Sequence, residues 1–505
     1  MADTGSPIWY AVVGLMDFSQ LSLNSASDVP LYKQLAESIT GLIGRGAIQS
    51  GDRLPPTREL ADQLGLNRTT ISAAYAALAE AGLIEGQVGR GSFVSLRESP
   101  AVRKDWDAIL PALDGSLLPA IGNIEISFAN SRPAAEAFPL KQFRRLAKEV
   151  IDSPDAGEIL QLGSPHGFPA LRRYLLEQST AEGTARSGDD LMITSGCQQA
   201  LDLLARLFVS DGKTVATEDP VYHGALRVFA RAGARLISVP VDYAGLDLDA
   251  LAEALQRHRP SLLVLTASFQ NPTGTTIPLD RRKRILDLAQ RSGTVLIEND
   301  IYSELRYCGN PVPTLKELDK TGDTILLRSY SKVAFPGLRV GWVIAPRAVI
   351  ARLAEAKQFS DLHSDQLSQA VLLRFAESGE LAAHLERTRR AGAERLNAVL
   401  SSCGRYLPPG TKFTRPEGGM SLWVELPAPL NAETLLIHVE ERGVNFLPGR
   451  FFSIGQAHSR CLRISFGGLS PEQITRGVRI LGDTAGRELA ASPVNQSFEP
   501  AAALV

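Results

Sequence analysis

A short stretch around one lysine combines the residue types that would hold a phosphorylated aldehyde. Lys332 follows Ser329 and Ser331 and precedes Arg339, where an apolar run gives way to a turn. A lysine amine forms a Schiff base with an aldehyde, and hydroxyls and a guanidinium bind a phosphate. Pyridoxal phosphate (PLP) is an aldehyde that carries a phosphate. The stretch therefore predicts Lys332 as a Schiff-base lysine and Ser329, Ser331 and Arg339 as phosphate ligands.

Other segments supply groups that the same cofactor would need. Residues 194–201 place small side chains before a predicted helix, whose free N–H groups suit a phosphate. Tyr222 would stack on the pyridine ring, and Asn271 and Tyr302 would hydrogen-bond to its phenolic oxygen. Arg463, in a predicted strand of a smaller C-terminal lobe, would bind a ligand carboxylate through two parallel hydrogen bonds.

Each of these segments also has a purely structural interpretation. The sequence Asn-Pro-Thr-Gly at 271–274 is a common turn, Tyr222 could belong to the core, and a single buried arginine such as Arg463 is as often structural as functional. Their order along about 350 residues is more specific than any one of them.

The first hundred residues have a different character. Apolar spacing predicts a helix over 31–43. A second helix is expected to begin with Thr57 as its N-cap, and Asn67 is expected to cap a third helix over 68–81. Two helices joined by a short turn form a helix-turn-helix, whose second helix enters the major groove of DNA by its N-terminal end.

The residue types at the start of that third helix fit contacts with DNA bases and phosphates. The hairpin expected at 83–94 is typical of a wing with a basic tip. Because residues 28–97 hold equal numbers of basic and acidic side chains, binding would depend on a local patch and on two copies per site. The structural alternative is a helical dimerisation cap. The expected DNA contacts are Arg53, Arg58, Arg68, Thr69, Thr70, Ser72 and Arg90.

Length and composition bound the class of protein. At 505 residues the chain is too long for one core, and its hydrophobic (44%) and charged (21%) fractions are ordinary for a globular protein. The net charge of −2 gives no general attraction to nucleic acid or acidic lipid. Four cysteines without a CxxC spacing favour a reducing cytoplasm and argue against a metal site. The apolar run 8–16 is too short to span a membrane.

The chain divides into five expected parts. Residues 1–27 form a leader, 28–96 the DNA-binding module, 97–123 a proline-bearing linker, 124–485 a large module and 486–505 a tail. In the large module, short Val/Ile/Leu runs alternate with helical patterns, which predicts an α/β fold with a mostly parallel sheet covered on both faces. Its residues from about 375, together with its N-terminal part, are expected to form a smaller α+β lobe.

The combined motifs resemble a known family of fusion proteins. The segments Thr-Arg-Glu-Leu-Ala, Asn-Arg-Thr-Thr and Gly-x-Gly-Ser-Phe-Val, in this order, resemble the GntR-type winged helix-turn-helix. The large module resembles the fold-type-I PLP-dependent aminotransferases. Together they resemble the MocR-type transcription regulators. The resemblance implies PLP as cofactor, and double-stranded DNA and a small amino compound as partners. It also implies a head-to-tail homodimer in the cytoplasm, at the nucleoid when bound to DNA.

The resemblance assigns roles to individual residues. Lys332 holds the cofactor as a Schiff base, Tyr222 stacks on the ring, Asn271 and Tyr302 hydrogen-bond to the phenolate, and Arg463 binds the carboxylate of the effector. The phosphate ligands that it implies are Ser195, Gly196, Cys197, Gln198, Ser329 and Arg339.

One departure from the aminotransferase pattern concerns the pyridine nitrogen. The family usually has an aspartate three residues before Tyr302, whose carboxylate keeps the ring protonated; here that position is Asn299. An amide supplies no charge, which would cost about 2–4 kcal/mol of transition-state stabilisation, or roughly 30- to 1,000-fold in rate. Asp300 would take the role if a bulge shifted the strand by one residue, because neighbouring strand residues face opposite ways. We favour Asn299.

A second departure is Leu162, where the family usually has a tyrosine whose hydroxyl reaches the cofactor phosphate of the other subunit. Both departures favour PLP as part of a sensor. We therefore expect a transcription regulator whose aminotransferase-like domain senses an amino compound or PLP. The alternative is an active amino acid aminotransferase that carries a DNA-binding domain. A module with a decayed site is a third hypothesis, disfavoured because Lys332 is retained together with its expected partners.

Overall fold

The computed structural model separates into two compact units, Met1–Asp114 and Gly115–Val505. It describes residues 18, 21, 23–25, 27–87, 89–95, 104–110, 123–209, 212–455 and 457–491. The apolar run 8–16 and most of the expected leader, linker and tail lie outside these residues. Within the linker, the described residues include one short helix, α4 (Trp106–Ile109).

The described part of the N-terminal unit folds as three helices and a hairpin. Asn67 caps the third helix as predicted, since its side-chain oxygen accepts a hydrogen bond from the Thr69 N–H at 3.1 Å. The prediction for Thr57 is wrong, because Pro56 takes the N-cap position and no side chain caps this helix. Leu35, Ile71 and other buried side chains give the unit its own core. The elements are α1 (Leu31–Gly44), α2 (Thr57–Leu64), α3 (Arg68–Glu80), β1 (Ile84–Gln87) and β2 (Gly91–Val94).

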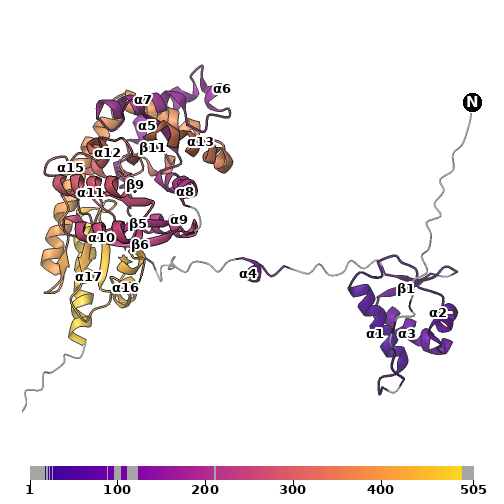
Figure 1. Ribbon diagram of the computed structural model, residues 1–505. Coiled ribbons are helices and arrows are strands. Elements are labelled where there is room, and N and C mark those ends of the chain that lie inside the picture. Colours follow the sequence, from indigo (N-terminus) through magenta and orange to yellow (C-terminus); the bar gives the residue numbers. More distant parts are fainter. Residues whose placement is uncertain are drawn as a thin grey trace, which may run out of the picture. The chain divides into compact units, whose positions relative to one another are not determined.

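An eight-stranded sheet forms the centre of the larger unit (Figure 1). The strand order is β4-β11-β10-β9-β8-β5-β6-β7. Strands β10, β9, β8, β5 and β6 run parallel to one another, and β11 runs antiparallel to both β10 and β4. The predicted mostly parallel α/β sheet is confirmed. The strands are β4 (Asp189–Thr194), β5 (Thr214–Asp219), β6 (Arg235–Asp242), β7 (Gly245–Leu246), β8 (Leu262–Leu265), β9 (Val295–Asn299), β10 (Ile325–Ser329) and β11 (Gly341–Pro346).

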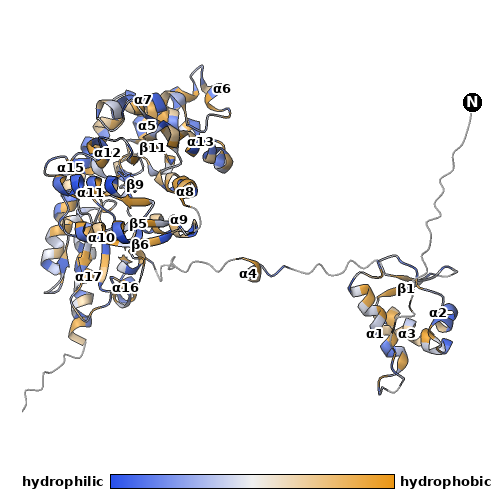
Figure 2. Cartoon of the chain, viewed as in Figure 1, coloured by the Kyte–Doolittle hydropathy of each residue, from blue (hydrophilic) through white to orange (hydrophobic). Residues whose placement is uncertain are grey.

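Helices cover both faces of this sheet. Successive strand residues point to opposite faces, so Met192 packs with α8 and α13, whereas Leu191 and Ile193 pack with α7 and α14. Helices α10 and α11 pack against the β5–β9 region, and Figure 2 shows the hydrophilic residues that they carry. No helix among the described residues is long and apolar enough to cross a membrane. The covering helices are α7 (Pro169–Ala181), α8 (Cys197–Phe208), α10 (Leu248–His258), α11 (Leu279–Ser292), α13 (Arg347–Asp361) and α14 (Gln366–Glu377).

A four-stranded antiparallel sheet, β12-β13-β16-β15, forms a smaller lobe with its own core. The short strand β3 (Ile126–Ser127) pairs in parallel with β14 (Val444–Asn445), and Phe128 is fully buried in the core of this lobe. Residues 126–128 are therefore part of the small lobe. Helix α17 ends at Ala491, six residues past position 485, where the large module is expected to end. The other elements of this lobe are β12 (Lys412–Phe413), β13 (Ser421–Glu425), β15 (Leu447–Pro448), β16 (Cys461–Ser465), α15 (Glu380–Tyr406), α16 (Ala432–Glu440) and α17 (Pro471–Ala491).

Candidate functional site

Most of the predicted ligand residues meet at the carboxyl edge of the large sheet. Strands β4, β5, β8, β9 and β10 end at this edge, so side chains distant in sequence converge there. A cavity of about 410 Å³ lies at this edge and is closed on one side by residues of β15 and β16. The predicted residues that line it are Cys197, Gln198, Tyr222, Asn271, Asn299, Tyr302, Ser329, Ser331, Lys332, Arg339 and Arg463.

Ser329, Ser331 and Arg339 form a polar cradle in one part of the cavity. The Ser329 and Ser331 hydroxyls lie 2.9 Å apart, and Arg339 donates hydrogen bonds to the Ser331 hydroxyl at 3.3 Å and to the Ser195 carbonyl at 3.2 Å. Gly196 has a φ of 77°, and any side chain there would clash with the Arg339 guanidinium. The cradle thus offers hydroxyls, a guanidinium and the N-terminus of α8 to an anion.

The residues that begin α8 contribute unequally. Ser195 and Gly196 do not line the cavity, and the Ser195 hydroxyl lies 3.2 Å from that of Ser364. Burial raises the pKa of the Cys197 thiol to about 12, so the thiol stays neutral. Gln198 accepts a hydrogen bond from the Tyr222 hydroxyl at 3.3 Å, which fixes the ring of this predicted stacking residue.

Lys332 follows β10 and places its amine in the cavity. Its Nζ donates a hydrogen bond to the Ser131 carbonyl at 2.5 Å. Burial, with smaller contributions from Arg463 and Arg339, lowers the pKa of Lys332 to about 8. Burial disfavours the ammonium form, and the neutral amine is the nucleophile. The environment therefore prepares Lys332 to attack a carbonyl group near neutral pH.

Arg463 reaches the cavity from β16 of the small lobe. It donates hydrogen bonds to the Asn271 side-chain oxygen at 2.9 Å and to the Ala129 carbonyl at 2.5 Å. Its Nε is buried and has no partner among the described residues. Burial lowers the pKa of Arg463 to about 10, so the guanidinium is still charged at neutral pH. A fixed, charged and incompletely satisfied guanidinium is suited to receive a carboxylate.

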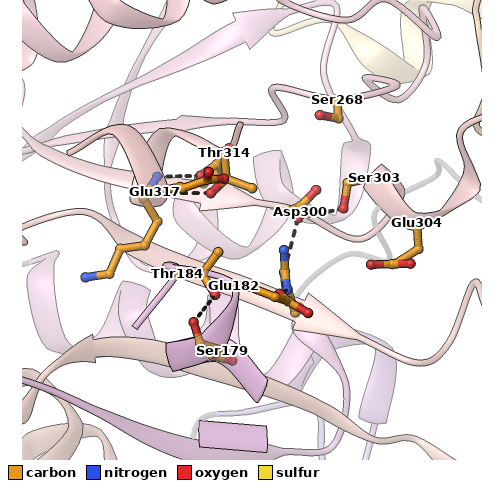
Figure 3. A network of polar contacts seen from close by, with 12 residues as sticks. Ser179, Glu182, Thr184, Ser268, Asp300, Ser303, Glu304, Thr314 and Glu317 are labelled. Atoms are coloured by element: carbon orange, nitrogen blue, oxygen red, sulfur yellow. Dashed lines mark hydrogen bonds and ion pairs between the residues drawn. The ribbon is translucent and has the colours of Figure 1, made fainter. Parts of the chain in front are cut away.

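The geometry distinguishes Asn299 from Asp300. Asn299 lines the cavity and its side-chain oxygen is buried without a partner among the described residues. Asp300 accepts hydrogen bonds from Ser303 at 2.8 Å and from Arg328 at 3.2 Å, in a polar network outside the cavity (Figure 3). Strand β9 pairs with β10 in regular register up to Asn299, without a bulge. The structure therefore places Asp300 beside Arg328 and not at the position expected for the pyridine nitrogen. The amide of Asn299 holds the position that faces the cavity.

Several cavity residues carried no functional prediction. They include His223, whose ring lies 5.1 Å from the Tyr222 ring and whose pKa burial lowers to about 4, so that it is neutral. Its place next to Tyr222 was an available signal. No sequence signal marked the carbonyls of Ala129 and Ser131, because every residue carries a carbonyl. Leu162 does not line the cavity and is 77% exposed.

The charges around the cavity define the ligand chemistry that it fits. Its described lining contains Lys332, Arg339 and Arg463, and no aspartate or glutamate. A phosphate carries close to two negative charges near pH 7, and a carboxylate adds a third. Together with a Schiff-base amine, an anion cradle and the unpartnered oxygen of Asn299, these residues fit PLP and an amino compound that carries a carboxylate. No described cluster of His, Cys, Asp or Glu could hold a metal ion.

In the N-terminal unit, the predicted DNA contacts lie on the surface. Arg68, Thr69 and Ser72 are exposed at the start of α3, and Thr70 is half-buried there. Arg53 forms an antiparallel bridge with Phe93 of the wing, and its guanidinium lies beside Gly91. The other basic residues predicted to contact DNA, Arg53, Arg58 and Arg90, are exposed as well.

Comparisons with known proteins match both units. Residues 31–94 match the family described as bacterial regulatory proteins, gntR family, and residues 130–481 match aminotransferase class I and II. The chain is 30% identical to the probable rhizopine catabolism regulatory protein MocR of Rhizobium meliloti, over 91% of this chain and 95% of that protein.

Two further matches cover 71% and 72% of the chain. The chain is 39% identical to 2-aminoadipate transaminase of Thermus thermophilus, over 71% of this chain and 89% of that protein. The crystal structure of LysN, an α-aminoadipate aminotransferase from Thermus thermophilus complexed with N-(5′-phosphopyridoxyl)-L-leucine, matches with a TM-score of 0.68 and 38% identity. That match covers 72% of this chain and 93% of LysN.

Proposed function

This chain belongs to the MocR-type proteins, PLP-dependent transcription regulators that join a GntR-family DNA-binding domain to a class I and II aminotransferase domain, and we propose that it senses an amino compound. On this proposal the amine of the compound reacts at the cofactor site of Lys332, its carboxylate binds Arg463, and the output is a change in DNA binding. The observation that carries the proposal is the cavity itself. Its described lining includes three basic side chains, one of them a lysine of lowered pKa, and no carboxylate.

The roles of the cavity residues follow from their contacts. Ser329, Ser331, Arg339 and the N-terminus of α8 would hold the phosphate, and Tyr222 would cover the ring. Asn271 accepts a hydrogen bond from Arg463 through its oxygen, so that its NH₂ group would be the donor to a phenolate. When bound, PLP supplies an aldehyde that exchanges amines and a ring that withdraws electrons.

Asn299 favours sensing over turnover. Its uncharged amide stands where a carboxylate would keep the ring protonated, and Asp300 cannot replace it because Asp300 binds Arg328 and Ser303. Capture of an amine would require only the aldehyde group that Lys332 holds as a Schiff base, whereas completing a transamination would also require the electron-withdrawing ring. We propose that the protein binds amino compounds readily and converts them slowly.

For DNA binding we propose that α3 enters the major groove by its N-terminal end and that the wing contacts the backbone. The residues exposed there are Arg68, Thr69, Ser72 and Arg90. Because the module has no excess of basic residues, one copy would bind weakly, and two copies on one operator would combine their affinities. The protein would then act at the nucleoid. We propose 28–96 as the DNA-binding module, 97–123 as the linker and the residues from 124 to the end of α17 as the sensor.

Two copies would be supplied by a head-to-tail homodimer of the larger units. Large apolar side chains are exposed at Leu160 and Leu162 and at Phe359 and Leu362. Hydrogen bonds from Gln366 to the carbonyls of Ile159 and Gln161 hold the first pair beside the start of α14, close in sequence to the second pair. Exposed large apolar side chains of this kind are typical of an interface. We propose that this surface pairs with a second copy.

The alternative function is an aminotransferase that also binds DNA. Lys332, Asn271 and Arg463 all line the cavity, which favours retention of some activity. Absorbance spectroscopy separates the two hypotheses. We expect a band of lysine-bound PLP that is lost in Lys332→Ala, a spectral change on adding amino acids, and little formation of the pyridoxamine form. Rapid multiple turnover with an amino donor and a keto acid would overturn the sensor proposal.

A further inference from the structure

A short segment of the chain accepts hydrogen bonds from the two cavity side chains that would bind a ligand, Arg463 and Lys332. Residues 129–132, here called the strap, follow Phe128 and lead into the large lobe. The carbonyl of Ala129 accepts a hydrogen bond from Arg463, and the carbonyl of Ser131 accepts one from Lys332. These are the two groups to which the effector carboxylate and the cofactor would bind. The strap is part of the chain and therefore competes with the ligand for Arg463 and Lys332.

The strap also lies between the two lobes. On its N-terminal side Phe128 is fully buried in the small lobe, where its N–H donates to the Asn445 carbonyl at 2.8 Å and its carbonyl accepts from the Ser465 N–H at 3.0 Å. On its C-terminal side the chain enters the large lobe, which carries Lys332. The Ala129 carbonyl thus contacts the small lobe and the Ser131 carbonyl contacts the large one.

The end of the linker is attached to the small lobe. Strand β3, which begins a few residues after the linker, pairs with β14 of this lobe, and the N–H of Ile126 donates to the Gly443 carbonyl at 3.0 Å. Any movement of the small lobe relative to the large one therefore moves the point from which the linker leaves.

We propose that the strap is a latch between the lobes that a ligand carboxylate opens by displacing the Ala129 carbonyl from Arg463. This inference rests on the proposed function, because it takes Arg463 as the carboxylate receptor. A carboxylate binds a guanidinium with two charge-assisted hydrogen bonds, which are roughly twice as strong as bonds between neutral groups. One carbonyl oxygen cannot match this. Opening the latch removes the tie that the strap makes between the lobes, while other contacts such as the bond from Arg463 to Asn271 remain. The small lobe, and with it the end of the linker, would then be held less tightly.

A pair of cofactor adducts that differ in one carboxylate tests the latch. N-(5′-phosphopyridoxyl)-L-leucine carries the carboxylate, and N-(5′-phosphopyridoxyl)-3-methylbutylamine lacks it. A spin label on Asn130→Cys, in a Cys308→Ser background that removes the exposed native thiol, reports the mobility of the strap in the full-length protein. DNA affinity is measured in parallel on an unlabelled sample, with a duplex selected in vitro by the purified full-length protein.

We expect the leucine adduct to mobilise the label and to change DNA affinity by about 5- to 150-fold, the usual range of allosteric coupling. We expect the amine adduct to bind without either effect. Without any ligand, Arg463→Met removes the Ala129 anchor and should mobilise the label. Arg132→Met removes a guanidinium from the exposed end of the strap and should leave the label immobile.

Three results would overturn the latch. If both adducts bind and mobilise the label equally, the carboxylate is not the trigger. If the leucine adduct shifts DNA affinity while the label stays immobile, sensing is established but does not run through the strap. If neither adduct binds the full-length protein, as read by its thermal unfolding, the proposed function fails and the latch fails with it.

Discussion

Replacing Asn299 by aspartate should accelerate the conversion of the PLP form to the pyridoxamine form. The residue lies at the end of β9, is 6% exposed, and has an oxygen without a partner among the described residues. A carboxylate there would pair with a protonated pyridine nitrogen. Two unit charges about 4 Å apart interact by about 4 kcal/mol at an effective dielectric constant of about 20. With part of this gain lost to desolvation, about 2–4 kcal/mol remains, which is roughly 30- to 1,000-fold in rate.

The assay is the single-turnover conversion of the PLP form to the pyridoxamine form with an amino acid, followed by absorbance. Asn299→Asp should raise this rate by the stated factor. Asp300→Asn is the matched control, because it exchanges the same two groups on the other side of the strand, where the partner is Arg328. The control should not accelerate the reaction.

A second consequence of Asn299→Asp concerns the cofactor-free protein. An uncompensated buried charge costs about 3–5 kcal/mol, so the variant should unfold at a lower temperature than the wild type. Addition of PLP should then raise its unfolding temperature more than that of the wild type. If Asn299→Asp reacts no faster than the wild type, the reasoning about residue 299 is refuted, and the slow step has another cause.

Three other predictions concern the lysine, the DNA contact and the interface. Because burial lowers the pKa of Lys332 to about 8 and only the neutral amine reacts, PLP incorporation into the cofactor-free protein should accelerate with rising pH and level off above about pH 8. A rate independent of pH from about 6 to 9 would contradict this. Arg68→Ala should weaken binding to a selected duplex by about 1–3 kcal/mol without changing the PLP spectrum; unchanged specific binding would move the recognition helix elsewhere. Phe359→Asp should dissociate the proposed homodimer in sedimentation, whereas Arg352→Asp, an exposed change on the same helix, should not.

The sequence was sufficient for the parts of the fold that depend on side-chain pattern. The strands are short apolar runs, and Asn67 is a capping residue next to a turn. Lys332 and Asn271 follow strands of the parallel sheet, and their spacing was enough to place them together because parallel strands end at the same edge. Arg463 reaches the same cavity from β16 of the small lobe.

The parts that the sequence missed depend on backbone groups and on strand register. The side chains of residues 129–132 do not indicate that the carbonyls of Ser131 and Ala129 bind Lys332 and Arg463. Asn299 and Asp300 could be separated only when the face of β9 was known. Thr57 satisfied the composition of an N-cap, but the backbone places Pro56 at that position.

The central claim is that chemistry at Lys332 controls DNA binding, and one titration tests it directly. The PLP-loaded full-length protein is mixed with a selected duplex and titrated with each member of a panel of amino acids and polyamines, while PLP absorbance and DNA affinity are recorded together. The account predicts that both signals change over the same ligand concentrations and that Lys332→Ala loses both responses. A saturating absorbance change without any change in DNA affinity would contradict it, as would a change in affinity that persists in Lys332→Ala.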